Sequence, residues 1–215
     1  MGQNSAIQKR CRGRPQVRPD EETLHLLVEA ATAEFQANGY AATTMGNVAQ
    51  RAGISTKTMY RLIPCKADLF EKVVSERIGI FMLEVNSNEL DKYDLVEAVE
   101  HMLVWFGKLT LSPETIALLR LVIGESDRFP ELAATFHEIA VVQSTNTIAG
   151  WLDRQRQRGL LKIDDPVKSA SALRGMMTMD LQRTAMLRLA NAPTTEEIEA
   201  RAKFCARLFV EGCRA

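Results

Sequence analysis

The chain has 215 residues, of which 46% are hydrophobic and 25% charged, and its 27 Lys and Arg balance its 27 Asp and Glu. These proportions are those of an ordinary globular protein and exclude collagen-like, low-complexity and strongly basic chains. No apolar run reaches the roughly 20 residues that a membrane helix needs. The basic N-terminal residues are followed by no apolar segment of the kind found in secretory signals, so we expect a cytoplasmic protein without membrane contact.

The neutral total hides an asymmetry of charge along the chain. Residues 1–66 carry nine Lys and Arg against five Asp and Glu, whereas the remaining residues carry more acidic than basic groups. A positive N-terminal end is attracted to a polyanion, and a negative remainder is kept away from it. The distribution therefore favours a nucleic-acid partner for the N-terminal end.

No pattern in the chain indicates catalysis, a metal or a cofactor. The three histidines are isolated, and there is no Gly-rich phosphate loop, nucleophile–base pair or metal-ligand spacing, so we expect no enzyme activity. The four cysteines are scattered and are expected to be reduced thiols: Cys11, Cys65, Cys205 and Cys213. Cys65 lies beside Lys66 at an expected helix start, where a thiolate is favoured, so a redox-sensing role stays open.

The first predicted elements are an arm and a long helix. Residues 1–19 are polar and basic, without an apolar period, and are expected to be disordered. Residues 20–38 form an amphipathic helix, because apolar residues recur at intervals of three and four positions. These apolar residues are Leu24, Leu27, Val28, Ala31 and Phe35. Gly39 suits the left-handed position that follows a helix.

Residues 41–66 have the features of a helix-turn-helix. Two short helices are expected, over residues 45–52 and 56–62. The hydroxyls of Thr44 and Ser55 are suited to cap them, and Gly53 permits the tight turn between them. The second helix of such a motif enters the major groove of DNA.

Everything after the motif has a helical pattern. Further helices are expected from Lys66 onward, and over residues 93–109, 113–126, 130–158, 166–190 and 195–212. The chain is therefore predicted to be all-α, with about nine helices. We divide it into the arm at residues 1–19, a DNA-binding domain at 20–66 and a ligand-binding and dimerisation domain at 67–215.

This layout and its residues resemble the TetR family of transcriptional regulators. The matching residues lie between residues 23 and 74: Ala30-Ala31, Phe35, Gly39-Tyr40, Ala42-Thr43-Thr44, Val48-Ala49, Ala52-Gly53-Ile54-Ser55, Thr58-Met59-Tyr60 and Pro64 to Leu69. The remainder is similar in helix count and order, and residues 118–132 look like one regulatory-domain subgroup. The resemblance implies a homodimer that represses transcription until a small ligand binds the C-terminal domain.

The resemblance also implies roles in DNA binding. Phosphate contacts fall to Thr44, Thr58, Tyr60 and Lys66, base contacts to Thr56 and Lys57, and a further DNA contact to Arg61. Met59 is expected in the core, with contact to a thymine methyl group as the alternative. The chain departs from the family pattern where Lys57 replaces a common Gly, where Leu62 and Ile63 replace an aromatic or His pair, and where Cys65 replaces Ser.

The basic arm contains Arg12-Gly13-Arg14-Pro15, which resembles the core of an AT-hook. In that motif, arginines on an extended segment enter a narrow A·T-rich minor groove. Arg12 and Arg14 are therefore candidate DNA contacts. The alternative is a solvated tail that adds only nonspecific affinity.

The regulatory half should contain a mostly apolar ligand pocket between helices. Candidate lining residues are Met102, Trp105, Phe106, Leu109, Arg120, Leu121, Trp151, Met177 and Asp180; core packing is the alternative for each apolar one. Polar residues on apolar helical runs are further pointers: His101, Arg120, Glu125, Arg174, Asp180 and Arg183. The abundance of Met favours a pliable pocket for a small apolar effector.

The last two helices are expected to form a four-helix bundle with those of a second copy. The predicted interface is an apolar stripe on the final helix: Ile198, Ala202, Cys205, Leu208, Phe209 and Gly212. A dimer would place two recognition helices about 34–36 Å apart, the spacing of a palindromic operator in double-stranded DNA. The alternative function is a DNA-binding protein without a small ligand, controlled by a protein partner or acting structurally on DNA. A fully packed C-terminal core would favour that alternative.

Overall fold

The computed structural model describes residues 18–214, except for the side chain of Asn88, and consists of α-helices joined by loops. The elements are α1 (Asp20–Ala42), α2 (Met45–Arg51), α3 (Thr56–Leu62), α4 (Lys66–Asn86), the 3-10 helix η1 (Asn88–Lys92), α5 (Leu95–Thr110), α6 (Pro113–Glu125), α7 (Pro130–Phe136), the π-helical segment η2 (His137–Gln143), α8 (Ser144–Gln157), α9 (Pro166–Met186) and α10 (Thr195–Cys213). α7, η2 and α8 run on as one helix, so the predicted all-α class and nine helices are confirmed within this part of the chain. η1 was not predicted.

The predicted N-terminal arm falls almost wholly outside the described residues. Residues 1–17 are not described, and they include Arg12 and Arg14. The minor-groove role of both arginines therefore stays a prediction.

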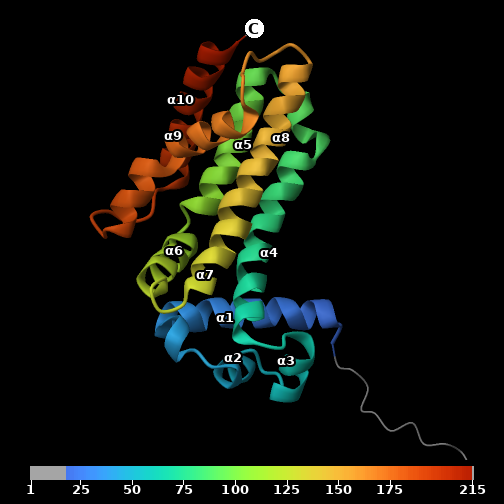
Figure 1. Cartoon of the computed structure of the whole chain (residues 1–215), viewed down its shortest axis with the longest axis vertical. Helices are drawn as coiled ribbons and strands as arrows, with labels where there is room; N and C mark the ends of the chain where they lie inside the picture. The colour runs from blue at the N-terminus through green and yellow to red at the C-terminus, as the bar shows by residue number, and fades with distance from the viewer. Residues whose placement is uncertain (1–17, 215) are drawn as a thin grey trace, which may run out of the picture.

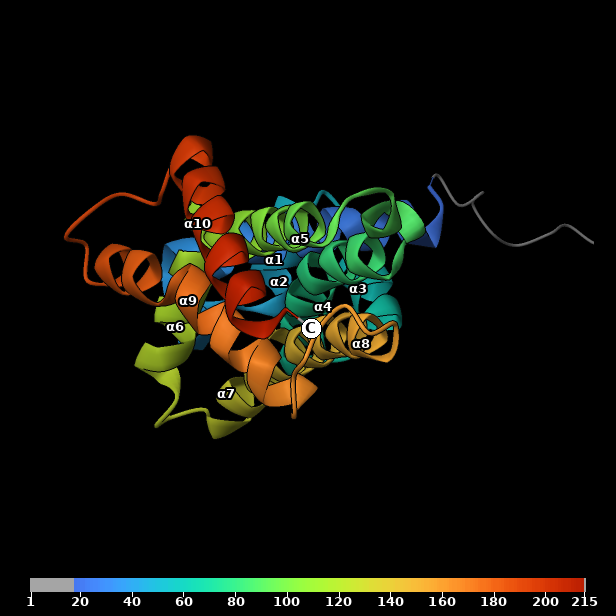
Figure 2. The same ribbon diagram turned by 90° about the horizontal axis from the view of Figure 1, so that it is seen from above.

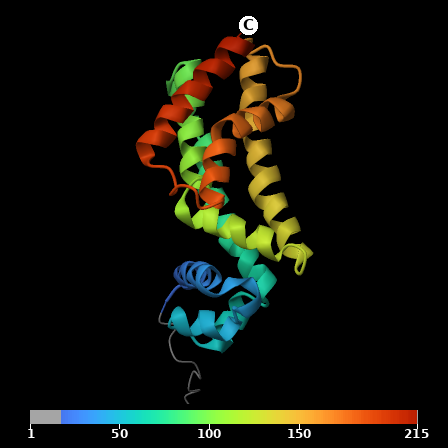
Figure 3. The same cartoon turned by 90° about the vertical axis from the view of Figure 1, so that its left-hand side faces the viewer.

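The three N-terminal helices form a small unit at one end of the molecule, and α4 leads from it into a helical bundle (Figure 1). α1 packs against α2, α3 and α4, and it also packs against α6 of the bundle. The view in Figure 3 shows α1 to α3 as a separate layer below the bundle. At the other end α10 lies along α5 and touches α9, as the view from above shows (Figure 2).

Two clusters of buried side chains hold the molecule together. The N-terminal core cluster contains residues of α1 to α4 together with Leu118 and Val122 of α6 and Leu132 of α7. The C-terminal core cluster joins the end of α4 to α5, α8, α9 and α10. α6 and α7 thus complete the N-terminal core cluster and join the bundle to the helix-turn-helix through packed side chains.

The start of α4 belongs to the N-terminal unit in its packing. Leu69, Phe70 and Val73 are buried in the N-terminal core cluster. The Phe70 ring lies 6.0 Å from that of Phe35 and 5.9 Å from that of Tyr40. The domain boundary at residue 66 stays a prediction, and α4 is shared between the two parts.

The glycine and capping residues identified in the sequence lie at the observed helix ends. Gly39 has a φ of 77°, which breaks α1 at the predicted position before one further helical turn. The side chain of Thr194 accepts a hydrogen bond from the backbone N–H of Glu197, and the Glu197 side chain accepts one in return from the backbone of Thr194. This reciprocal pair is the predicted capping box of α10.

Apolar side chains of α5 and α6 are buried in the two core clusters. Within the described residues no single helix is long and apolar enough to cross a membrane; these two reach that threshold only as a pair, across a 59° bend. Phe106 and Leu118, one from each helix, are buried in the two core clusters.

Gly107 marks the closest approach of α5 to α9 and α10. A Cβ atom at this position would lie 2.5 Å from Cε of Met177 and 2.7 Å from Cγ2 of Ile198. Gly107→Ala is therefore expected to lower the free energy of unfolding by about 1–3 kcal/mol through overpacking. Urea unfolding measures it, with Gly124→Ala as the matched control, because no described atom beyond the adjacent backbone of its own helix lies within 4 Å of a Cβ there. Equal stability of the two variants would contradict this packing.

Candidate DNA interface and regulatory cavity

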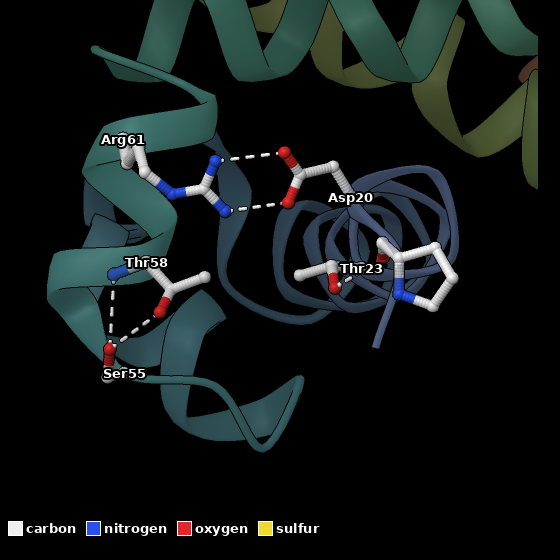
Figure 4. A network of polar contacts seen from close by, with 6 residues as sticks. Asp20, Thr23, Ser55, Thr58 and Arg61 are labelled. Atoms are coloured by element: carbon white, nitrogen blue, oxygen red, sulfur yellow. Dashed lines mark hydrogen bonds and ion pairs between the residues drawn. The ribbon is translucent and has the colours of Figure 1, made fainter. Parts of the chain in front are cut away.

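The helix-turn-helix forms where it was predicted, with both caps in place. The Thr44 hydroxyl accepts a hydrogen bond from the backbone N–H of Asn47 at 3.2 Å. The Ser55 hydroxyl accepts one from the N–H of Thr58 at 3.1 Å and lies 2.9 Å from the Thr58 hydroxyl (Figure 4). Gly53, with a φ of 68°, makes the turn. These local bonds fix the start of α3.

One face of α3 is anchored in the core. Met59 is fully buried and Ile63 is 1% exposed, both in the N-terminal core cluster. The interpretation of Met59 as a core residue is thereby confirmed. Burial of this face turns the other face of α3 outward.

The outward face of α3 carries polar side chains at its N-terminal end. Thr56 and Lys57 are exposed, and the Tyr60 side chain is 53% exposed. An exposed Lys and hydroxyl groups on one helical face can donate hydrogen bonds to base edges and phosphates. The face therefore has the chemistry required of a recognition helix.

Arg61 is committed to an ion pair with α1. Its guanidinium donates to both carboxylate oxygens of Asp20, at 2.9 and 2.7 Å (Figure 4). The pair ties α3 to the first turn of α1 from its exposed side. A phosphate contact by Arg61 would have to share the guanidinium with this carboxylate, so its predicted role in DNA binding stays a prediction.

The ammonium group of Lys66 is hydrogen-bonded within the protein, so its predicted role as a phosphate contact stays a prediction. Its Nζ donates to the carbonyl oxygens of Tyr40 at 2.7 Å, Ala41 at 3.3 Å and Thr43 at 3.0 Å. It also lies 4.5 Å from the centroid of the Tyr40 ring. Lys66 thus satisfies carbonyls at the C-terminal end of α1, and burial lowers its pKa.

Lys66→Met is therefore expected to destabilise the protein by about 1.5–3 kcal/mol, the value of hydrogen bonds made by a charged group. Urea unfolding measures this loss. If the three carbonyl groups also hold the ammonium in the DNA complex, the slope of log K against log salt concentration for DNA binding should stay unchanged. A slope reduced by about 0.9 for each Lys66 would show that the ammonium does contact phosphate.

The described part of the regulatory half contains a cavity of about 220 Å³. It is bounded by α4, α5, α6, the α7–η2 segment and α9. The lining residues are Val74, Arg77, Ile78, Phe106, Leu109, Thr110, Thr115, Leu118, Leu119, Phe136, Ala140, Val141, Arg174, Thr178 and Gln182. Val74, Ile78 and Leu118 belong to the N-terminal core cluster and Phe106 to the C-terminal one, so the cavity lies where the two cores meet.

The structure brings only some of the predicted pocket residues to this cavity. Phe106 and Leu109 line the cavity, as does Arg174, which was singled out as a polar residue on an apolar run. Three predicted lining residues are packed in the C-terminal core cluster instead: Met102, Trp151 and Met177.

The other four predicted lining residues also lie away from the cavity. Leu121 packs against the N-terminal core cluster. Trp105 and Arg120 border separate surface hollows. Asp180 is exposed, and its Oδ2 lies 3.6 Å from Nη2 of Arg201. None of the four lines this cavity, because helical periodicity identifies buried or polar faces without identifying which neighbour they meet.

The contribution of η2 was missed. Ala140 and Val141 of this π-helical segment line the cavity, together with Phe136 just before it. A π-turn widens the helix locally and is common at functional sites. The available sequence signal was the run Ser144-Thr145, whose hydroxyls donate to the carbonyls of Ala140 and Val141.

The predicted dimer stripe on α10 is largely a core of the chain itself. Ile198, Ala202, Cys205 and Phe209 are buried in the C-terminal core cluster, where α10 packs on α5. These four residues cannot form an exposed interface, and this part of the prediction was wrong. Leu208 is 53% exposed, and Phe204, one helical turn before it, is 60% exposed. An exposed apolar patch on α10 therefore exists, displaced from the predicted one.

No metal site accompanies these features: the described residues contain no group of three or more His, Cys, Asp or Glu placed to hold an ion. Cys65 caps α4, its sulfur accepting from the N–H of Asp68 at 3.5 Å. Its redox role stays a prediction.

Comparison with protein families gives two matches. Residues 27–73 match the model of bacterial regulatory proteins of the tetR family. Residues 97–212 match that of the C-terminal domain of AefR-like transcriptional repressors. No curated protein matches the chain significantly.

Solved structures share the whole fold. A TetR-family transcriptional regulator from Mesorhizobium loti is 24% identical with a TM-score of 0.79, over 92% of this chain and 100% of that one. The flavonoid-responsive regulator FrrA is 25% identical with a TM-score of 0.71, over 90% and 98% of the two chains. SmeT, repressor of the multidrug efflux pump SmeDEF of Stenotrophomonas maltophilia, is 20% identical with a TM-score of 0.62, over 92% and 93%.

Proposed function

This chain belongs to the TetR family of transcriptional regulators, and we propose that it is a homodimeric repressor that leaves a palindromic operator when a small molecule occupies its cavity. The family membership makes DNA binding by α2 and α3 its basic activity. The observation that carries the proposal is the position of the cavity, between the core that supports α3 and the core of the bundle.

α4 is the element through which a ligand would act. Val74 and Ile78 line the cavity, and one to two turns earlier Leu69 and Phe70 hold the helix-turn-helix. A ligand that favours a different position of α4 changes the separation of two recognition helices in a dimer. Shifting such an equilibrium from 1:99 to 99:1 takes about 5.5 kcal/mol of differential binding.

A second copy of the chain is the proposed partner for α9 and α10. Phe204 and Leu208 on α10 and Met179 on α9 are exposed apolar residues that a dimer would cover. The dimer supplies the two-fold symmetry that a palindrome requires.

A cavity at the junction of the two cores supports a small-molecule signal over control by a protein partner alone. FrrA, a regulator of similar fold, is flavonoid-responsive, which supports a small molecule as the signal here. We also propose a cytoplasmic location, where the operator would be found.

The test is selection of binding sites from a random duplex library with the purified full-length chain, followed by transcription in vitro from a promoter carrying the selected site. A palindromic site and reduced transcription are expected. Selection of a site without reduced transcription would reject repression while leaving DNA binding intact.

A further inference from the structure

Arg174 of α9 is a largely buried cation without an acidic partner among the described residues. Its Nη1 donates to the hydroxyl of Thr145, and its Cζ lies 5.2 Å from the centroid of the Phe106 ring. Its Nε is buried and has no hydrogen-bond partner in the part of the chain that the structure describes. A guanidinium has five N–H donors and stays protonated in proteins, and the hydrogen bond to Thr145 uses one of them.

The surroundings of Arg174 do not neutralise it. Within residues 18–214, the cavity lining contains no Asp or Glu, and it includes a second cation, Arg77 of α4. Burial lowers the pKa of Arg174, the sign of a site that disfavours positive charge. A buried charge is ordinarily paired, because leaving it unpaired is costly.

The rest of the lining is apolar apart from a few hydroxyl and amide groups. Phe106, Leu118 and Phe136 come from three different helices, while Thr178 and Gln182 follow Arg174 along α9. The Gln182 side chain already donates to the carbonyl of Thr110 at 3.2 Å. The cavity therefore offers one strong site for an anion and apolar walls for the remainder of a molecule.

We propose that the ligand of this cavity is a small organic acid whose carboxylate pairs with the guanidinium of Arg174 and whose apolar body packs against Phe106, Leu118 and Phe136. This inference rests on the proposed function and changes the expected effector from a wholly apolar molecule to an anionic, amphipathic one. The planar guanidinium matches a carboxylate through two parallel hydrogen bonds. Since a cavity of about 150 Å³ holds benzene, the 220 Å³ here suits one ring with a short acidic side chain.

The position of Arg174 also explains how such a ligand reaches α4. The anion lies between α9 and the η2–α8 junction, where Thr145 holds the guanidinium, while Arg77 extends the positive lining onto α4. The ligand would thus bring cations of two helices toward one negative charge.

The test compares 3-phenylpropanoate with its neutral isostere 3-phenylpropanamide, by calorimetry and thermal shift on the full-length protein. The acid is expected to bind wild type at least about tenfold more tightly than the amide, as a charge-assisted hydrogen bond requires. In Arg174→Met this preference should fall below about twofold, whereas Arg183→Met, at an exposed position of the same helix, should retain it. Equal binding of acid and amide to wild type, binding of neither, or a preference kept in Arg174→Met would overturn the assignment.

The ligand-free variants provide an independent readout. Because no described Asp or Glu pairs with Arg174, Arg174→Met is expected to melt at a temperature equal to or above that of wild type. A clearly lower melting temperature would show that the arginine stabilises the fold, which contradicts its assignment as a cation kept for an anionic ligand. Release of the operator is measured separately. Acid binding without release would reject the proposed function and keep the anion site. Release by the amide alone would reject the anion site and keep the proposed function.

Discussion

Replacing Phe204 and Leu208 together by Glu is expected to convert a dimer into a monomer and to lower operator affinity by at least about 100-fold, the loss that accompanies separation of two linked binding events. Both side chains are exposed and one turn apart on α10, so the substitution adds charge to the outer face without disturbing the buried face against α5. Light scattering gives the oligomeric state and fluorescence anisotropy the affinity.

The matched control is Leu83→Glu with Ile123→Glu, because these residues are also exposed and apolar but lie on α4 and α6. This control should remain dimeric. A dimer that survives the α10 substitutions, or a monomer that binds the operator as tightly as wild type, would reject the proposed interface.

Lys57→Ala is expected to weaken binding to the operator by at least about 25-fold, because one base contact contributes about 1–3 kcal/mol and a dimer makes it twice. Lys57 is exposed at the start of α3, and the helix is held by Ser55, Met59 and Ile63 without it. The fold should therefore be unaffected. Affinities for the operator and for unrelated duplex, measured side by side, give both the loss and the specificity ratio.

Lys162→Ala, at an exposed position of the loop between α8 and α9, is the control and should bind as wild type does. An equal loss of affinity for operator and unrelated DNA in Lys57→Ala would place the lysine on phosphates and not on a base.

Sequence reasoning worked where the determining interactions are local. The caps at Thr44, Ser55 and Thr194 and the glycine at position 39 act within four residues, and the helices begin or end where these signals lie. The helix-turn-helix was predicted for the same reason.

It failed where the partner of a side chain is distant in sequence. Lys66 bonds to carbonyls more than twenty residues earlier, and no local pattern shows that its three hydrogens are used. The apolar stripe of Ile198 and Phe209 was real, but periodicity could not show that α5 of the same chain covers it.

The lining of the cavity could be predicted only in part. Apolar residues at helical spacing, such as Met102 and Phe106, are alike in sequence, and only the three-dimensional packing separates a core residue from a lining residue. A polar residue on an apolar helix was the better signal, and Arg174 shows why: a charge placed there requires a partner.

The central claim, that one symmetric dimer reads a palindrome through two α3 helices, is tested most directly by changing the spacing of the selected operator. Inserting about 5 base pairs between the half-sites rotates one of them to the opposite face of the duplex, since a helical turn is about 10–10.5 base pairs. Nuclease footprinting with purified protein should then show a loss of at least about 100-fold in affinity. An insertion of about 10 base pairs returns the half-site to the same face, and it restores affinity only where the dimer can span the longer distance. Undiminished protection of the operator carrying the 5-base-pair insertion would contradict the account.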